Sequence, residues 1–158
     1  MRIILTVLAM ALSACGPSPP APSQTPQSAP AQQAETPDAA ALQAAVAALP
    51  APYNEASYEA GRRVFAQCRS CHTIDAGGAN RVGPNLHGVI GRTTASAAGF
   101  NYSDALRAAN FTWDAEHIDQ WLANPQSFLP GNRMAFAGVR DPNQRRDVIA
   151  YVTVEAAR

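Results

Sequence analysis

Three residues in the short stretch CRSCH could do chemistry together: Cys68, Cys71 and His72. A C-x-x-C pair by itself is compatible with half of a zinc site, a dithiol redox motif or a site of haem attachment. A structural zinc site would need a fourth ligand, and only His87 or His117 remains in the domain to supply it. A thioredoxin-like site would need a strand before the motif and βαβ patterning around it, neither of which the sequence shows.

The histidine after the second cysteine favours haem attachment. In C-x-x-C-H, two thioether bonds fix the porphyrin, and the histidine becomes an axial ligand of the iron. A second feature points the same way: Met134, in FLPGNRMAF, is the only methionine left once an N-terminal signal removes Met1 and Met10. A thioether as sixth ligand favours ferrous iron and raises the reduction potential, as an electron carrier requires. The alternative is that Met134 only fills the core.

These residues need helices and loops to position them. Residues 56–69 carry an apolar stripe at helical spacing, and Gly61 on or near it would cost a helix about 1 kcal/mol unless it serves close packing. A further helix is expected from Thr112 as N-cap to a stop at Pro125, with apolar residues at Ile118, Trp121 and Leu122. There is little strand signal, and glycine-rich loops that could wrap a large flat ligand make up the rest.

Several long motifs, in order, resemble one family. GRRVFAQCRSCHT, GPNLHGVIGR, GFNYSDA, NPQSFLPGNRMAFAG and RRDVIAYV are similar to segments of the class I c-type cytochromes, close to mitochondrial cytochrome c and its bacterial relatives. The resemblance runs from about Tyr58 to Val152. It implies an all-α cytochrome c fold with about four to five short helices around one haem c per chain, attached through Cys68 and Cys71. It also implies His72 and Met134 as axial ligands.

The resemblance assigns further site residues. The Pro84 carbonyl is expected to accept a hydrogen bond from His72, although Pro84 could also simply shape a turn. The expected haem propionate contacts are Arg92, Tyr102, Ser103 and Trp113, with core packing or an exposed charge as the alternative reading. The N-terminal helix is expected to cross the C-terminal helix, residues 143–156, at Val148 and Tyr151.

The sequence departs from mitochondrial cytochromes near the methionine. Leu106, Trp121 and Asn132 stand where asparagine, tyrosine and threonine are common. The hydrogen-bond network on the methionine side is therefore expected to differ. His87 and His117 could in principle compete for the iron, but we interpret both as surface or loop histidines.

The N-terminus has a separate organisation. Residues 1–14 combine Arg2, an apolar run and two small residues, which predicts an export signal. LSAC resembles the lipobox of bacterial lipoproteins, so Cys15 is the expected lipidation site; ordinary cleavage near Ala14 is the alternative. Residues 16–37 contain seven prolines and predict a flexible chain. We therefore expect a signal peptide at 1–14, a lipid-anchored linker at 15–52 and a cytochrome domain at 53–158.

The charge of the chain limits which partners are expected. The net charge is zero and no lysine is present, which argues against nucleic acid. The lysine ring around the haem edge of mitochondrial-type cytochromes is mostly replaced: Gln67, Gln126, Ser127 and Asp141 occupy its positions, and only Arg81, Arg133 and Arg140 keep a positive charge.

We expect a monomeric electron shuttle with no enzymatic activity, on the periplasmic face of a bacterial membrane, the cytoplasmic membrane in preference to the outer one. Its partners would be a quinol-oxidising complex, a terminal oxidase or a periplasmic dehydrogenase. A permanent subunit of an oxidase or dehydrogenase, or a haem gas sensor or peroxidase, is the alternative.

Overall fold

The computed structural model describes residues 38–158, and helices with connecting loops make up this part of the chain. In chain order the helices are α1 (Ala39–Ala47), the 3-10 helix η1 (Tyr53–Glu55), α2 (Tyr58–Phe65), α3 (Asp104–Ala108), α4 (Ala115–Ala123), α5 (Pro125–Phe128) and α6 (Pro142–Glu155). Within these residues the only β-type pairing is a single bridge between Thr93 and Thr112. None of the described helices is long and apolar enough to cross a membrane.

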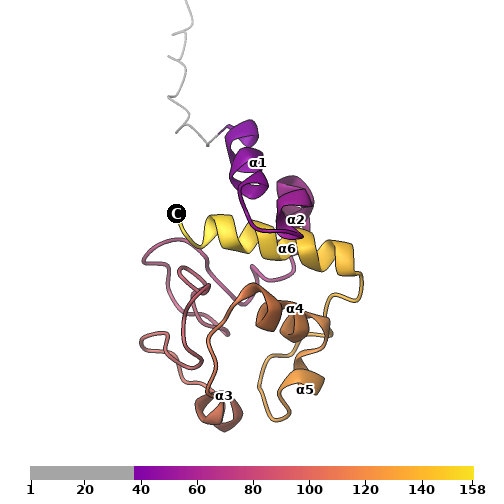
Figure 1. Ribbon diagram of the computed structural model, residues 1–158. Helices are drawn as coiled ribbons and strands as arrows, with labels where there is room; N and C mark the ends of the chain where they lie inside the picture. The colour runs from indigo at the N-terminus through magenta and orange to yellow at the C-terminus, as the bar shows by residue number, and fades with distance from the viewer. Residues whose placement is uncertain (1–37) are drawn as a thin grey trace, which may run out of the picture. The chain divides into compact units, whose positions relative to one another are not determined.

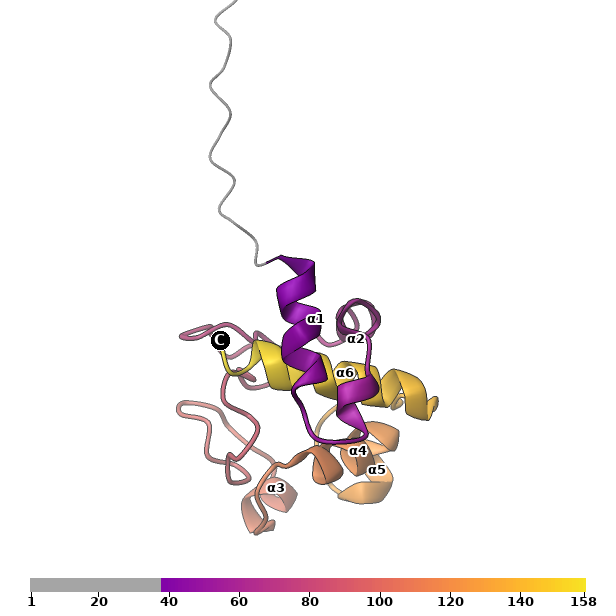
Figure 2. The ribbon, with the colours of Figure 1, turned by 45° about the horizontal axis from the view of Figure 1, so that its top comes forward.

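Helix α6 is the central element of the fold. Helices α1 and α2 lie on one side of it and α4 and α5 on the other (Figure 1). Figure 2 looks almost along α2, with α6 running across the view. The side chains of α6 that face its neighbours, Val148, Ile149, Ala150 and Tyr151, are almost completely buried.

Gly61 permits the crossing of α2 and α6, as the sequence predicted. A Cβ at Gly61 would lie 2.1 Å from the carbonyl oxygen of Asp147 and 2.7 Å from Cβ of Tyr151, so any side chain would push the helices apart. The rings of Tyr58 and Phe65 each pack 5.1 Å from that of Tyr151, measured between centroids. The expected contact at Tyr151 is thus confirmed.

Helix α1 corrects the predicted domain boundary. The flexible linker was expected to extend to residue 52, but Ala39–Ala47 is helical, with Asp38 as its N-cap. Its Val46 is fully buried. The Gln43 side chain donates to the carbonyl of Ala56 at 2.9 Å and accepts from the Tyr58 N–H at 2.9 Å, which fixes α1 to the start of α2. The apolar packing and these hydrogen bonds stabilise a helix that the alanine-rich sequence alone did not signal.

The other helix ends differ slightly from expectation. Asp114, and not Thr112, caps α4, because its carboxylate accepts from the His117 N–H at 2.8 Å while Thr112 pairs with Thr93. Asn124 ends α4 and also caps the short α5, which begins at Pro125. Helix α2 ends at Phe65, four residues before the predicted end, and the chain continues in turns that carry the CRSCH motif. The signal peptide and Cys15 lie outside the described residues.

Candidate functional site

The CRSCH motif follows α2 as one tight turn. The N–H groups of Cys71 and His72 both donate to the Cys68 carbonyl, at 3.1 and 2.9 Å, and the Cys68 N–H donates to Phe65 at 2.8 Å. Both sulfurs and the imidazole line one cavity. Burial, with a smaller effect of Cys71, raises the pKa of the Cys68 thiol to about 11. A nucleophilic dithiol needs a lowered pKa, so this environment does not suit thioredoxin-like chemistry.

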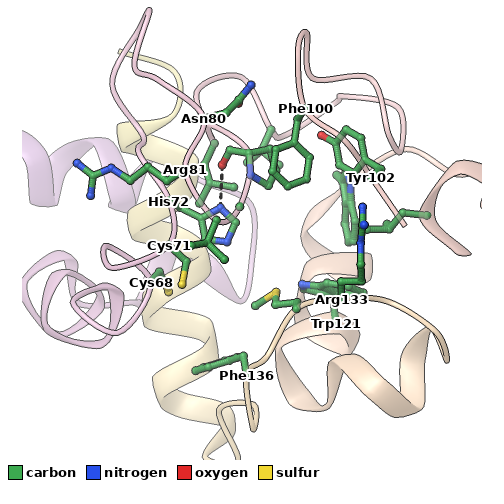
Figure 3. Close-up of a pocket in the computed structure, with 18 of the residues that line it drawn as sticks. Cys68, Cys71, His72, Asn80, Arg81, Phe100, Tyr102, Trp121, Arg133 and Phe136 are labelled. Carbon is green, nitrogen blue, oxygen red and sulfur yellow. Dashed lines mark hydrogen bonds between the residues drawn. The ribbon is translucent and has the colours of Figure 1, made fainter. Parts of the chain in front are cut away.

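His72 is held by the GPN turn. Its Nδ1 donates to the Pro84 carbonyl at 2.7 Å, the hydrogen bond dashed in Figure 3, which leaves Nε2 as the acceptor nitrogen. Gly83 packs against the ring, since a Cβ there would lie 2.2 Å from its Cε1. Burial lowers the pKa of His72, against the opposing effect of the Pro84 hydrogen bond. The neutral imidazole that metal ligation requires is therefore the favoured form.

The cavity has a volume of about 810 Å³, within the range of cofactor pockets of roughly 300–1,000 Å³. Apolar side chains from the end of α2, from α4 and from α6 form much of its wall; among them are Phe65, Ile118, Leu122, Val148 and Val152. Met134 lines the same cavity as His72. In Figure 3, Cys68, Cys71 and His72 lie on one side of the cavity, and Tyr102, Trp121 and Arg133 on the other.

The four residues assigned to propionates also line this cavity. Arg92 is half-buried, and its guanidinium donates to the carbonyls of Asn85 and His87 at 3.0 and 3.2 Å. The buried Tyr102 hydroxyl accepts from the Ala97 N–H at 3.3 Å. Ser103 caps α3 through its Oγ, which leaves its own proton available for another acceptor. The Trp113 ring packs edge-on against Trp121, with centroids 5.4 Å apart.

Comparison with known proteins identifies the family. A model of the cytochrome c family matches residues 58–154. The cytochrome c of Kluyveromyces lactis is 42% identical over 105 residues, which cover 66% of this chain and 96% of that protein. A cytochrome c homolog of Bradyrhizobium diazoefficiens is 44% identical over 98 residues, 61% of this chain and 53% of that protein. The chain belongs to the cytochrome c family.

A solved structure agrees with this assignment. Cytochrome cH from Methylobacterium extorquens superimposes with a TM-score of 0.57 at 41% sequence identity, over 61% of this chain and 96% of that one. The predicted all-α cytochrome c fold is confirmed. The family binds haem c covalently through two cysteines, which in this cytochrome are Cys68 and Cys71. The residues present fit the group: two sulfurs and a neutral imidazole on one turn, at the wall of a largely apolar cavity.

The two remaining histidines of this cytochrome lie outside the cavity wall. His117 pairs through Nδ1 with Asp114 at 2.8 Å and stacks on Phe111, with centroids 4.6 Å apart. The backbone of His87 is held, since its N–H donates to Asn85 Oδ1 and its carbonyl accepts from Arg92, whereas its ring Nδ1 is buried and has no hydrogen-bond partner among the described residues. Neither side chain is part of the cavity wall. Among residues 38–158, no group of three or more His, Cys, Asp or Glu side chains is placed to hold a metal ion.

Several cavity residues were not predicted from the sequence. Phe100 and Phe136 come from loops, where an isolated aromatic residue carries no periodic signal. Gly83 could have been found, since a glycine directly before Pro84, the residue expected to bind His72, suggests a close approach to that ring. Asn85 orders the loop between the motif and Arg92: its amide donates to Thr73 and Asp75, and its N–H to Asn80.

Proposed function

We propose that this cytochrome is a membrane-tethered carrier of single electrons, with His72 and Met134 as the axial ligands of its haem iron. The observation that carries the proposal is that both side chains line the cavity into which Cys68 and Cys71 also face. When bound, the haem supplies the Fe(II)/Fe(III) couple. A six-coordinate iron has no open position for a substrate, which favours electron transfer over catalysis or gas sensing.

The protein's own contribution is to hold ligands and exclude water. Pro84 fixes the His72 tautomer, so Nε2 is the ligating nitrogen. The apolar wall of the cavity would keep water from the haem, and apolar surroundings together with a thioether ligand raise the reduction potential. We assign Arg92, Tyr102, Ser103 and Trp113 to the propionates, whose charge needs donors in a buried site.

The tether is proposed from the N-terminal sequence. Lipid on Cys15 would anchor the chain, because several acyl chains at about 0.8 kcal/mol per buried methylene give stable membrane attachment. The proline-rich segment would then act as a leash ending at α1. Such a leash raises the effective concentration of the carrier near membrane partners to the millimolar range. The anchored domain would lie at the periplasmic face of a bacterial membrane, preferentially the cytoplasmic one, with a quinol-oxidising complex, a terminal oxidase or a periplasmic dehydrogenase as partner.

The charge distribution supports tethering, and not electrostatic steering, as the means of finding a partner. Without residues 1–14 the chain has eleven arginines and twelve acidic residues. Two arginines that line the cavity keep their charge and donate to backbone carbonyls: Arg81 to Arg69 at 2.9 Å, and Arg133 to Asn101. Electrostatic steering of partners should therefore be weak, so that tethering replaces it.

Mass spectrometry of the mature protein from its native membrane tests both attachments. One haem and two or three acyl chains, with Cys15 as first residue, is the expected result. A mature chain that starts elsewhere would remove the tether. The sulfur-to-iron charge-transfer absorption band of the ferric protein tests Met134 as ligand, and its absence at neutral pH would favour a sensor or peroxidase.

A further inference from the structure

A buried carboxamide lies next to Met134. Asn132 follows the PG turn and is only 7% exposed. Its Nδ2 donates to two carbonyls of the α5 segment, Pro125 at 2.8 Å and Leu129 at 2.9 Å. Its Oδ1 accepts from the Met134 N–H at 2.8 Å. Both protons and the oxygen of this side chain are thus used, as a buried polar group requires.

A second carboxamide holds the other side of the same residue. Gln126, on α5, donates through Nε2 to the Met134 carbonyl at 3.2 Å and to Asn132 Oδ1 at 3.4 Å. The N–H of Met134 is therefore bound by one side chain, and its C=O, which also accepts from the Phe136 N–H at 3.0 Å, is bound by another. We call Asn132 and Gln126 the amide clamp.

The clamp joins Met134 to α5. The turn between them has Gly131 at φ +85°, and the Asn132 N–H donates to Leu129 at 3.2 Å. A threonine at position 132 has a single hydroxyl, with one proton, and cannot donate to two carbonyls while also accepting from Met134. The Asn132 part of the clamp therefore requires a carboxamide at that position.

We propose that Asn132 and Gln126 are positioning residues that keep the Met134 thioether in the cavity and oppose its displacement by another ligand. The proposal rests on Met134 being the sixth ligand. Movement of the Met134 backbone away from the cavity would break the hydrogen bond from its N–H to the buried Asn132 and the one from Gln126 to its carbonyl. The clamp should thus lower the population of the open, methionine-free state without touching the iron itself.

The test is imidazole binding to the ferric holoprotein, combined with amide hydrogen exchange at Met134. In Gln126→Ala, whose side chain is exposed and loses one or two hydrogen bonds, imidazole affinity should rise roughly fivefold. In Asn132→Ala it should rise more than tenfold, because buried carbonyls lose their donor as well. Exchange of the Met134 N–H should accelerate in Asn132→Ala. Ser127→Ala, at the exposed neighbouring position on α5, is the matched control and should leave both readouts unchanged.

Different results would contradict the clamp and the assignment of Met134 as a ligand. Unchanged imidazole affinity in Gln126→Ala, together with unchanged Met134 exchange in Asn132→Ala, would overturn the clamp. If Asn132→Ala does not yield holoprotein, Gln126→Ala alone decides, on affinity and on Met134 exchange. Failure of the underlying ligand assignment has a different signature: Met134→Ala would then bind imidazole no more tightly than the unmodified protein, because no thioether would be displaced.

Discussion

Gly83 offers a sharp test of how the histidine is held. A Cβ at this position would lie 2.2 Å from Cε1 of His72 and 2.7 Å from both ring nitrogens, so a methyl group would sit on the ring. To bring the 2.2 Å contact to an ordinary 3.4 Å, the separation must grow by 1.2 Å. The loop cannot easily supply that movement, because the Gly83 N–H donates to the Cys71 carbonyl at 2.8 Å and the next residue accepts from His72 at 2.7 Å.

The expected cost of Gly83→Ala follows from these contacts. Overpacking costs about 1–3 kcal/mol, and loss of the hydrogen bond to Pro84 about 0.5–1.5 kcal/mol. A total of about 2–4 kcal/mol should lower the thermal midpoint of the holoprotein by on the order of 10 °C. Covalent haem should still be present by mass, since neither cysteine is disturbed, whereas the ferric spectrum should report weakened axial ligation.

Val82→Ala is the matched control for this experiment. Val82 is the adjacent residue; it lines the cavity but is 80% exposed, so its truncation should leave the thermal midpoint unchanged. If Gly83→Ala unfolded at the same temperature as the unmodified protein and kept its spectrum, the ring would not be confined by this glycine, and the account of His72 would be refuted.

Three further predictions concern residues around the site. Tyr58 donates to Glu155 at 2.7 Å, and burial, followed by that bond, raises the pKa of its hydroxyl above the usual 10.0. The folded state therefore retains a proton that the unfolded state loses, so the free energy of unfolding, measured with denaturant, should fall as the pH rises past 10 and should fall less in Tyr58→Phe. Val46→Ala should weaken the packing of α1 by about 2 kcal/mol, because Val46 is fully buried. Proteolysis near residues 39–47 should then increase while the haem spectrum stays the same; unchanged proteolysis would show that α1 is held by Gln43 alone. The electron-transfer rate of a chain beginning at residue 38 should depend only weakly on ionic strength, and a steep fall with added salt would contradict the proposed weak steering.

The sequence predicted the parts whose chemistry is local. A C-x-x-C-H turn is specified by five consecutive residues, and the crossing of α2 and α6 by one glycine that has no other reason to be in a helix. The start of α4 and the packing of α1 depend instead on contacts with residues far away in the sequence. Thr112 is as good a cap as Asp114 by type, and only its pairing with Thr93 across the loop removes it. Likewise, Ala39–Ala47 could not be told from linker by composition, because what stabilises it is burial of Val46 and two hydrogen bonds of Gln43.

The position of α1 bears on how a tethered carrier would present its cofactor. None of the residues that line the cavity comes from α1. The proposed leash therefore joins the folded domain at Asp38, on a helix that packs against α2 and α6 and not on a loop of the cavity wall. A leash attached directly to residue 53 would pull on the short segment before α2, whose last turn leads into Cys68. With α1 docked, a pull must first break the contacts of Val46 and Gln43, so the attachment point is mechanically separated from the turn that carries the haem.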